Sequence, residues 1–173
     1  KDTAKLSLNL PVVKDKEDEW DCEIKVNKAI LELTRHGGGP VHINLPTTYS
    51  KPFTVKAPIN CRVINRFYQR DKLPVIDFKK KVAVFIGSHK NWTEEEVDAL
   101  ECFSKAYNVV VFCDHTSGYR GENRLLFSLA AAQEFLNRSA VQPDLTIHIG
   151  EITGDYPSTN MVGKEVWRIS DDG

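Results

Sequence analysis

Apolar and amphipathic segments alternate along the second half of the chain. Four apolar runs have the length of strands, and they cover 81–87, 108–113, 145–149 and 166–169. The first three are nearly continuous, as expected for strands buried on both faces of a sheet. Stretches with the spacing of amphipathic helices separate these three runs. Because strands and helices alternate, the pattern predicts βαβ units and an open α/β domain with a parallel sheet.

Two helices of this domain are predicted from capping and from apolar spacing. The first opens at Thr93, because Thr-Glu-Glu-Glu forms a capping box. Its apolar face comprises Val97, Leu100, Phe103 and Tyr107. The second helix is predicted over about 122–137. Its inward-facing positions would be Leu125, Leu126, Leu129 and Leu136.

The first half of the chain predicts one helix and one strand. The helix covers about 22–35 and is ended by Gly37. Its apolar positions are Val26, Ala29, Ile30 and Leu33. The strand follows at 41–45, where apolar and polar residues alternate. Residues 1–19 are polar and charged, so they are expected to form an exposed arm or loop.

A proline-rich connector follows the predicted strand. Residues 46–60 contain three prolines with several Thr and Ser but no sustained periodicity, which indicates an extended, fairly stiff linker. Over 62–78 the apolar positions are scattered, and both a short helix and an extended lead-in fit them. The strand at 41–45 is therefore interpreted as the last strand of one domain, most of which would precede it. On this interpretation the chain is a piece of a larger protein.

Composition narrows the class of protein. With 173 residues, 41% of them hydrophobic and 27% charged, the chain fits a soluble globular protein of one domain with an appendage. A net charge of -1 argues against nucleic-acid binding. The apolar runs are too short for a transmembrane helix, and the N-terminus lacks the apolar core of a signal peptide. The four cysteines form no CxxC pair, which argues against a zinc site and favours a reduced, cytoplasmic setting.

Small and polar residues follow the three best strands. In an open parallel sheet, ligands bind beyond the carboxyl ends of the strands, near a topological switch point. The candidate residues of such a cleft are Gly87, Ser88, His89, Asp114, Thr116 and Gly150. Turns after strands also favour Gly, Ser and Asp for backbone reasons alone, so a purely structural interpretation stays open beside the functional one.

Several kinds of chemistry lack their sequence signature. The turn GSHKNWT after the first strand has one glycine, so neither a GxGxxG fingerprint nor a Walker loop is present. His89, His115 and Asp114 could converge for acid–base or metal chemistry, although solvated loop histidines explain them as well. Ser88 lacks a nucleophile elbow. His42 and His148 lie within strands and are expected to be packed or hydrogen-bonded. No catalytic residue and no metal ligand is therefore assigned.

The segment GGGPVHINLP at 37–46, followed by a linker and an α/β domain, resembles a family of thiamine diphosphate-dependent enzymes. This family includes acetohydroxyacid synthase, pyruvate decarboxylase and the MenD group. The resemblance implies that 1–46 are the end of a pyrimidine-binding domain, 47–60 a linker and 61–173 a central Rossmann-like domain with helices on both faces, which need not be complete. The sequence FIGSHKNW…NVVVFCDHTSGYRG is similar to sequences of thiamine-dependent synthases found with bacterial surface-polysaccharide genes.

The family implies formation or cleavage of a carbon–carbon bond of a 2-oxo acid, with thiamine diphosphate and Mg²⁺ as cofactors, in a cytoplasmic homo-oligomer. Its catalytic glutamate and its GDG motif with a downstream Asn match no position of this sequence. The triplet Asp171-Asp172-Gly173 is not followed by that Asn. The chain by itself is therefore expected to be catalytically inert, with the missing catalytic domains of the same chain as its partners.

The central domain has two possible roles on this resemblance. Some relatives hold FAD or an adenine nucleotide there, and others leave it empty. The absence of a glycine fingerprint favours the empty version, in which the domain spaces the two catalytic domains. The alternative is an independent nucleotide-binding module in which Ser88, Asp114 and Gly150 hold an adenine nucleotide.

Overall fold

The computed structural model describes residues 3–47, 60–127, 131–133, 137–151 and 162–171. The chain divides into two compact units, Lys1–Leu73 and Pro74–Gly173, here called unit 1 and unit 2. The domain boundaries predicted at 46 and 61 refer to the parent family and stay a prediction. None of the helices in the described part is long and apolar enough to cross a membrane.

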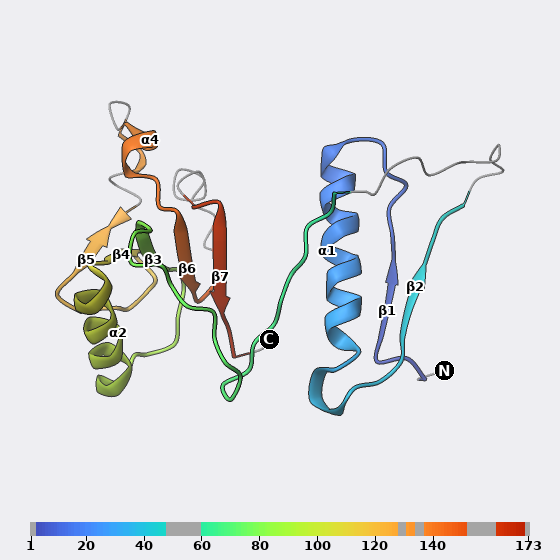
Figure 1. The fold of residues 1–173 in the computed structure, drawn as a ribbon, viewed down its shortest axis with the longest axis horizontal. Coiled ribbons are helices and arrows are strands. Elements are labelled where there is room, and N and C mark those ends of the chain that lie inside the picture. Colours follow the sequence, from blue (N-terminus) through green and yellow to red (C-terminus); the bar gives the residue numbers. More distant parts are fainter. Residues whose placement is uncertain (1–2, 48–59, 128–130, 134–136, 152–161, 172–173) are drawn as a thin grey trace. The chain divides into compact units, whose positions relative to one another are not determined.

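Unit 1 is a single βαβ element. Strand β1 (Leu6–Asn9) leads into helix α1 (Lys16–Glu32), and strand β2 (Val41–Asn44) returns beside β1 in parallel (Figure 1). The strand predicted at 41–45 is confirmed to within one residue. A 3-10 turn at Arg35–Gly37 joins α1 to β2, and Gly38 follows it with a φ of 77°.

The expectation of an exposed arm over 1–19 is wrong. Residues 6–9 form β1, and the acidic run that looked like a loop is the first turn of α1. Asp15 caps this helix, because its carboxylate accepts hydrogen bonds from the Glu17 and Asp18 N–H groups, both at 2.9 Å. The acidic side chains of the first turn also interact favourably with the positive end of the helix dipole. Their charge therefore favours a helix start.

The two faces of the small sheet in unit 1 differ in polarity. The apolar side chains of β1 and β2 are half-buried on one face, and the polar ones are exposed on the other. Across the exposed face a hydrogen bond joins Ser7 Oγ and His42 Nδ1 at 3.1 Å, and Asn44 Nδ2 donates to Asn9 Oδ1 at 3.1 Å. His42 is thus hydrogen-bonded, as predicted.

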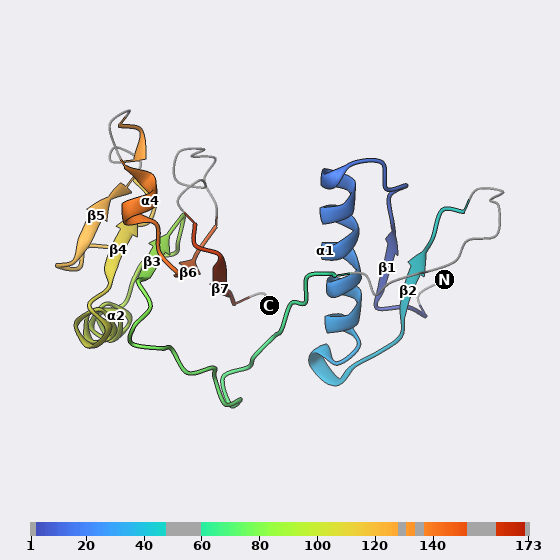
Figure 2. The same ribbon diagram turned by 45° about the horizontal axis from the view of Figure 1, so that its top comes forward.

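Unit 2 is an α/β domain built on an open five-stranded sheet. Its strands are β3 (Val82–Ile86), β4 (Val110–Cys113), β5 (Arg124–Leu126), β6 (Leu145–Ile149) and β7 (Glu165–Ile169). All neighbours are parallel, in the order β5-β4-β3-β6-β7 (Figure 2). This confirms the four predicted strands and the predicted fold class. Strand β5 was not predicted.

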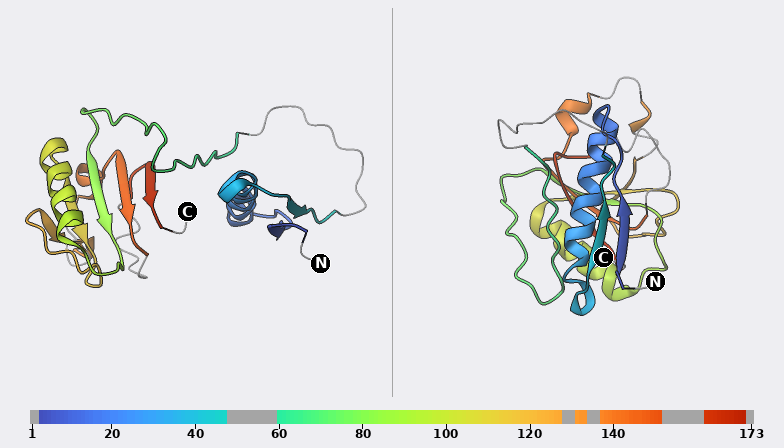
Figure 3. Two further views of the ribbon diagram at one scale, coloured as in Figure 1. Left: turned by 90° about the horizontal axis from the view of Figure 1, so that it is seen from below. Right: turned by 90° about the vertical axis from the view of Figure 1, so that its right-hand side faces the viewer.

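Helix α2 (Glu94–Tyr107) covers one face of this sheet (Figure 3). The predicted capping box is present, since Glu96 N–H donates to Thr93 Oγ1 at 3.2 Å and Thr93 N–H donates to Glu96 Oε2 at 2.9 Å. The four predicted apolar positions of α2 all pack on the main core. That core consists mainly of Val84, Ile86, Val111, Cys113, Leu145 and Ile147 from the strands, with Leu100 from the helix.

The helix predicted over 122–137 is corrected by the structure. Residues 124–126 form β5 on the edge of β4, and the side chains of Leu125 and Leu126 are exposed. The edge of β4 needs a hydrogen-bonding partner, and this requirement outweighs local helical spacing. Leu129 and Leu136 lie outside the described residues. Short helix α4 (Arg138–Val141) follows. Phe127 and Ala131 are buried against the face of the sheet opposite α2.

The segment before the first strand of unit 2 is extended. Residues 60–78 contain neither a helix nor a strand, and a turn closes where Asp71 N–H donates to Tyr68 O at 2.9 Å. Of the two alternatives for 62–78, the extended lead-in is therefore confirmed.

Candidate functional site

The carboxyl edge of the five-stranded sheet gathers all six predicted site residues. Gly87, Ser88 and His89 follow β3, Asp114 and Thr116 follow β4, and Gly150 follows β6. The three strands are neighbours and run in the same direction, so their ends lie at one edge. The topological switch point lies between β3 and β6, because the chain builds β4 and β5 on one side of β3 and then crosses to the other.

The switch point is closed by hydrogen bonds between the two turns that flank it. Ser88 N–H donates to Glu151 O at 2.9 Å, and Glu151 N–H donates to Ser88 O at 2.8 Å. In addition, Gly87 N–H donates to Ile149 O at 2.9 Å. The turns after β3 and β6 thus form a short antiparallel bridge at the place where a dinucleotide would enter the crevice.

The glycines of the candidate cleft serve this close approach. A Cβ at Gly87 would collide with Glu151 O, and a Cβ at Gly150 would collide with Ser88 O. Gly150 also has a φ of 81°, which a residue with a side chain rarely adopts. Both glycines therefore have a backbone function that is sufficient to explain them.

Asp114 is a buried turn residue. Its Oδ1 accepts hydrogen bonds from Thr116 N–H at 2.7 Å and from Thr116 Oγ1 at 2.9 Å. His115 Nδ1 lies 3.0 Å from the same oxygen, and the His115 ring is exposed. The carboxylate of Asp114 and the hydroxyl of Thr116 are therefore hydrogen-bonded to each other within the turn.

His89 belongs to an aromatic cluster that joins the turns after β3 and β4. Its Nδ1–H donates to Lys90 O at 2.9 Å, and its ring stacks on Trp92 at 4.4 Å between centroids. Trp92 Nε1–H donates to Ser117 O at 2.8 Å, and Trp92 meets the ring of Tyr119 edge-on at 5.2 Å. Sequence reasoning missed Trp92 and Tyr119. The available signal was a Trp immediately before a helix cap.

Besides Asp114, three buried titratable groups lie close to this edge or along its strands, and burial favours the neutral form of each. Burial, followed by the negative charge of Glu101, raises the pKa of Tyr119 to about 12. Burial also raises the pKa of the Cys113 thiol, so it is a poor nucleophile. In β6, burial and then Arg168 lower the pKa of His148. The predicted packing of His148 is confirmed, since its ring lies 5.5 Å from that of Phe85.

The charged side chains at this edge are paired. Arg168 binds Glu151 at 2.7 Å, and Lys90 lies 3.4 Å from Asp171 and 3.7 Å from Glu96. Both cations thus face carboxylates, which would compete with a bound phosphate. Within the described ranges, no three His, Cys, Asp or Glu side chains converge as a metal site would require.

A small cavity lies on the face of the sheet opposite α2. Its volume is about 10 Å³, which holds no more than one water molecule. The residues that line it are Ala83, Phe85, Phe112, Phe127, Pro143, Thr146 and Val162. Its size and its apolar lining give no place for a nucleotide.

Comparison with known proteins finds relatives that all carry the same name. A protein of Phocaeicola vulgatus is 48% identical over 82 residues, and one of Bacteroides thetaiotaomicron is 46% identical over 82 residues. Each of these matches covers 43% of this chain and 14% of the relative. A protein of Bacteroides fragilis is 34% identical over 117 residues, which cover 63% of this chain and 20% of the relative. All three are named 2-succinyl-5-enolpyruvyl-6-hydroxy-3-cyclohexene-1-carboxylate synthase.

This chain is partly homologous to these MenD synthases. It spans a fifth or less of the length of the curated relatives it matches. No protein-family model matches it. The homology agrees with the resemblance drawn from GGGPVHINLP at the level of the MenD group. The similarity to synthases found with surface-polysaccharide genes stays a prediction.

Proposed function

We propose that this chain is part of a longer thiamine diphosphate-dependent synthase that forms a carbon–carbon bond from a 2-oxo acid. The observation that carries the proposal is the 48% identity over 82 residues with the synthase of Phocaeicola vulgatus. In the longer protein, residues 1–46 would end the pyrimidine-binding domain, 47–60 would be a linker and 61–173, which include unit 2, would be the central domain.

Unit 2 would act in that protein as a non-catalytic spacer between the catalytic domains. The bridged switch point and the paired cations at the carboxyl edge support this role. Thiamine diphosphate, when bound, supplies a nucleophilic carbon and an electron sink. The described residues do not fit its diphosphate and Mg²⁺, since they bring no set of metal ligands together. Other parts of the longer protein would hold the cofactor, and the protein would be a cytoplasmic homo-oligomer.

Two measurements test the proposal. A longer protein that contains this chain should form 2-succinyl-5-enolpyruvyl-6-hydroxy-3-cyclohexene-1-carboxylate, the compound in the relatives' name, when thiamine diphosphate and Mg²⁺ are present. Absence of product from a folded, cofactor-saturated protein would contradict that assignment. Calorimetry of this chain alone with thiamine diphosphate and Mg²⁺ should show no heat of binding, and submicromolar binding would refute the spacer role.

A nucleotide-binding module is the competing function, and a thermal-shift series separates the two. The chain is heated with ADP, FAD or NAD, and the spacer role predicts no change in the melting temperature. A rise of several degrees that disappears in Asp114→Ala would favour the module, because Asp114 is one of the three residues that would hold the nucleotide. The matched control is Asp98→Ala, which removes an exposed carboxylate of α2 away from these three residues.

A further inference from the structure

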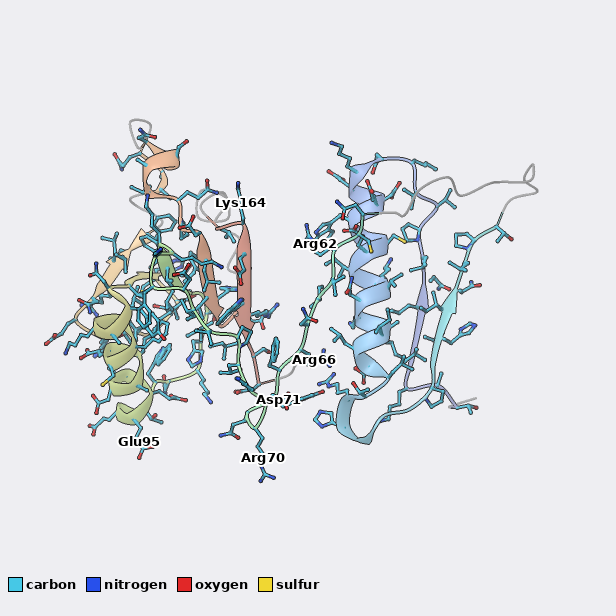
Figure 4. The ribbon with its side chains drawn as sticks, viewed as in Figure 1. Arg62, Arg66, Arg70, Asp71, Glu95 and Lys164 are labelled. Atoms are coloured by element: carbon cyan, nitrogen blue, oxygen red, sulfur yellow. The ribbon has the colours of Figure 1, made fainter. Side chains whose placement is uncertain are left out.

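Three hydrogen bonds hold residues 62–64 on helix α1, and all of them use the main chain of that segment. Arg62 N–H donates to Glu23 Oε1 at 3.1 Å. Asn27 Nδ2–H donates to Arg62 O at 2.9 Å, and Ile64 N–H donates to Asn27 Oδ1 at 2.8 Å. Figure 4 shows Arg62 beside α1. No side chain of the segment takes part in these bonds.

The side-chain amide of Asn27 substitutes for one residue of a parallel strand. In a parallel ladder, one residue donates to the carbonyl before its partner and accepts from the N–H after it. Asn27 does the same around Val63, since it reaches the carbonyl of residue 62 and the N–H of residue 64. Asn27 Nδ2 also donates to Glu23 O at 2.8 Å within α1, which fixes the orientation of the amide.

A helix has no free backbone groups in its middle with which to pair an extended segment. Glu23 and Asn27 lie one turn apart on α1, so their side chains project from the same face. Together they supply two acceptors and one donor in a row. Val63, the residue between the bonded groups, contributes little apolar burial in return, because it is 71% exposed, whereas Ile64 is 36% exposed.

We propose that Glu23 and Asn27 form a main-chain clamp, which anchors residues 62–64 to helix α1 within unit 1 regardless of the side chains at these three positions. The clamp thereby holds an extended segment on α1 through its main chain, as a neighbouring strand would.

Amide hydrogen exchange on the whole chain tests the clamp. In Asn27→Leu, which keeps the volume of the side chain but removes its donor and acceptor, the Ile64 amide should exchange about fivefold faster or more. The matched control is Lys28→Leu at the neighbouring exposed position of α1, and it should leave this amide unchanged. The Ala29 amide monitors α1 itself. An Ile64 amide that exchanges at the rate of an unstructured peptide in the unaltered chain would overturn the proposal.

Two further pairs of variants separate main-chain from side-chain recognition. They test the clamp even if the Asn27→Leu variant fails to fold. Ile64→Ala keeps the N–H and should leave the Arg62 amide protected, whereas Ile64→Pro removes the N–H and should expose it. Glu23→Gln keeps an oxygen acceptor for Arg62 N–H, whereas Glu23→Ala should accelerate its exchange about fivefold. Equal release in Ile64→Ala and Ile64→Pro would show side-chain packing and overturn the proposal. The outcome has no bearing on the synthase assignment.

Discussion

Both units consist of a parallel sheet with a helix packed on it, but they bury very different numbers of apolar side chains. Among the described residues, fourteen of the sixteen buried apolar side chains lie in unit 2, and only Leu10 and Ala29 lie in unit 1. Unit 2 is stabilised by burial, whereas unit 1 depends mainly on strand pairing, on the cap at Asp15 and on the clamp at Glu23 and Asn27. A two-stranded sheet of this kind is marginal by itself.

The difference in buried apolar surface is clearest at the apolar face of α1. Its predicted inward positions included Ile30 and Leu33, which are 56% and 46% exposed, and only Ala29 is buried. The corresponding positions of α2 all pack on the core of unit 2. The pattern of α1 is that of a helix with a larger partner surface, which agrees with the proposal that unit 1 ends a bigger domain.

Truncation of one isoleucine in each unit is expected to give the largest contrast. Ile86 is fully buried in β3, so Ile86→Ala should lower the free energy of unfolding of unit 2 by about 2–5 kcal/mol. Ile30→Ala in α1 should cost less than about 1 kcal/mol, because half of that side chain already faces solvent. Urea unfolding followed by circular dichroism measures both, and tryptophan fluorescence in a Trp20→Phe background assigns the transition of unit 2. Equal losses would remove the contrast in core.

A methyl group at a left-handed glycine gives the next largest contrast. Gly150→Ala adds backbone strain and a collision with Ser88 O, so it should destabilise unit 2 by about 2 kcal/mol or more. Gly37→Ala in unit 1 adds strain alone, since no atom lies within 4 Å of the new Cβ, and should cost about 1 kcal/mol. Thermal unfolding compares the two variants. A neutral Gly150→Ala would show that the bridge between Ser88 and Glu151 does not form.

Removal of the helix caps should cost about the same in both units. Thr93→Ala and Asp15→Ala each remove the side chain that caps a helix, and each should destabilise its helix by about 1 kcal/mol. The consequence differs, because α2 stays packed on a core while α1 has little else to hold it. Amide exchange should therefore spread along all of α1 in Asp15→Ala and stay confined to the first turn of α2 in Thr93→Ala. Confinement in both would show that α1 is better supported than its burial indicates.

Strands β3, β4 and β6 were predictable because burial on both faces leaves nearly continuous apolar runs, and α2 was predictable from the capping box at Thr93. Strand β1 carried a local signal that the sequence analysis did not use, because Leu6 and Leu8 alternate with Ser7 and Asn9 at the period of a strand. Strand β5 was missed for a physical reason, since it has three exposed residues without such alternation and is a strand because the edge of β4 supplies its hydrogen-bond partners. Local periodicity carries no information about such partners.

The sequence predicted where the candidate residues lie, but it did not predict that hydrogen bonds close the switch point between them. The carboxyl ends of neighbouring parallel strands meet at one edge, so the six residues were correctly brought together. The bridge between Ser88 and Glu151 depends on how two turns from β3 and β6 approach one another, which no local pattern encodes. Glycine at both 87 and 150 was the sole sign of that approach, and glycine is equally common in ligand-binding turns.

The smallest effect concerns pH and again separates the units. The buried imidazole of His148 has a lowered pKa in the folded state, while its unfolded pKa is about 6.5. Above pH 6.5 both states are neutral and the group has no effect on stability. As the pH falls below 6.5, the unfolded state takes up the proton first, so the stability of unit 2 should fall by at most about 1.4 kcal/mol per pH unit. Urea unfolding between pH 7.5 and 5.5 measures this slope for unit 2 in the unaltered chain and in His148→Gln, which should reduce it. A slope unchanged in His148→Gln would assign the pH dependence to other groups and show that burial in β6 does not hold this imidazole neutral.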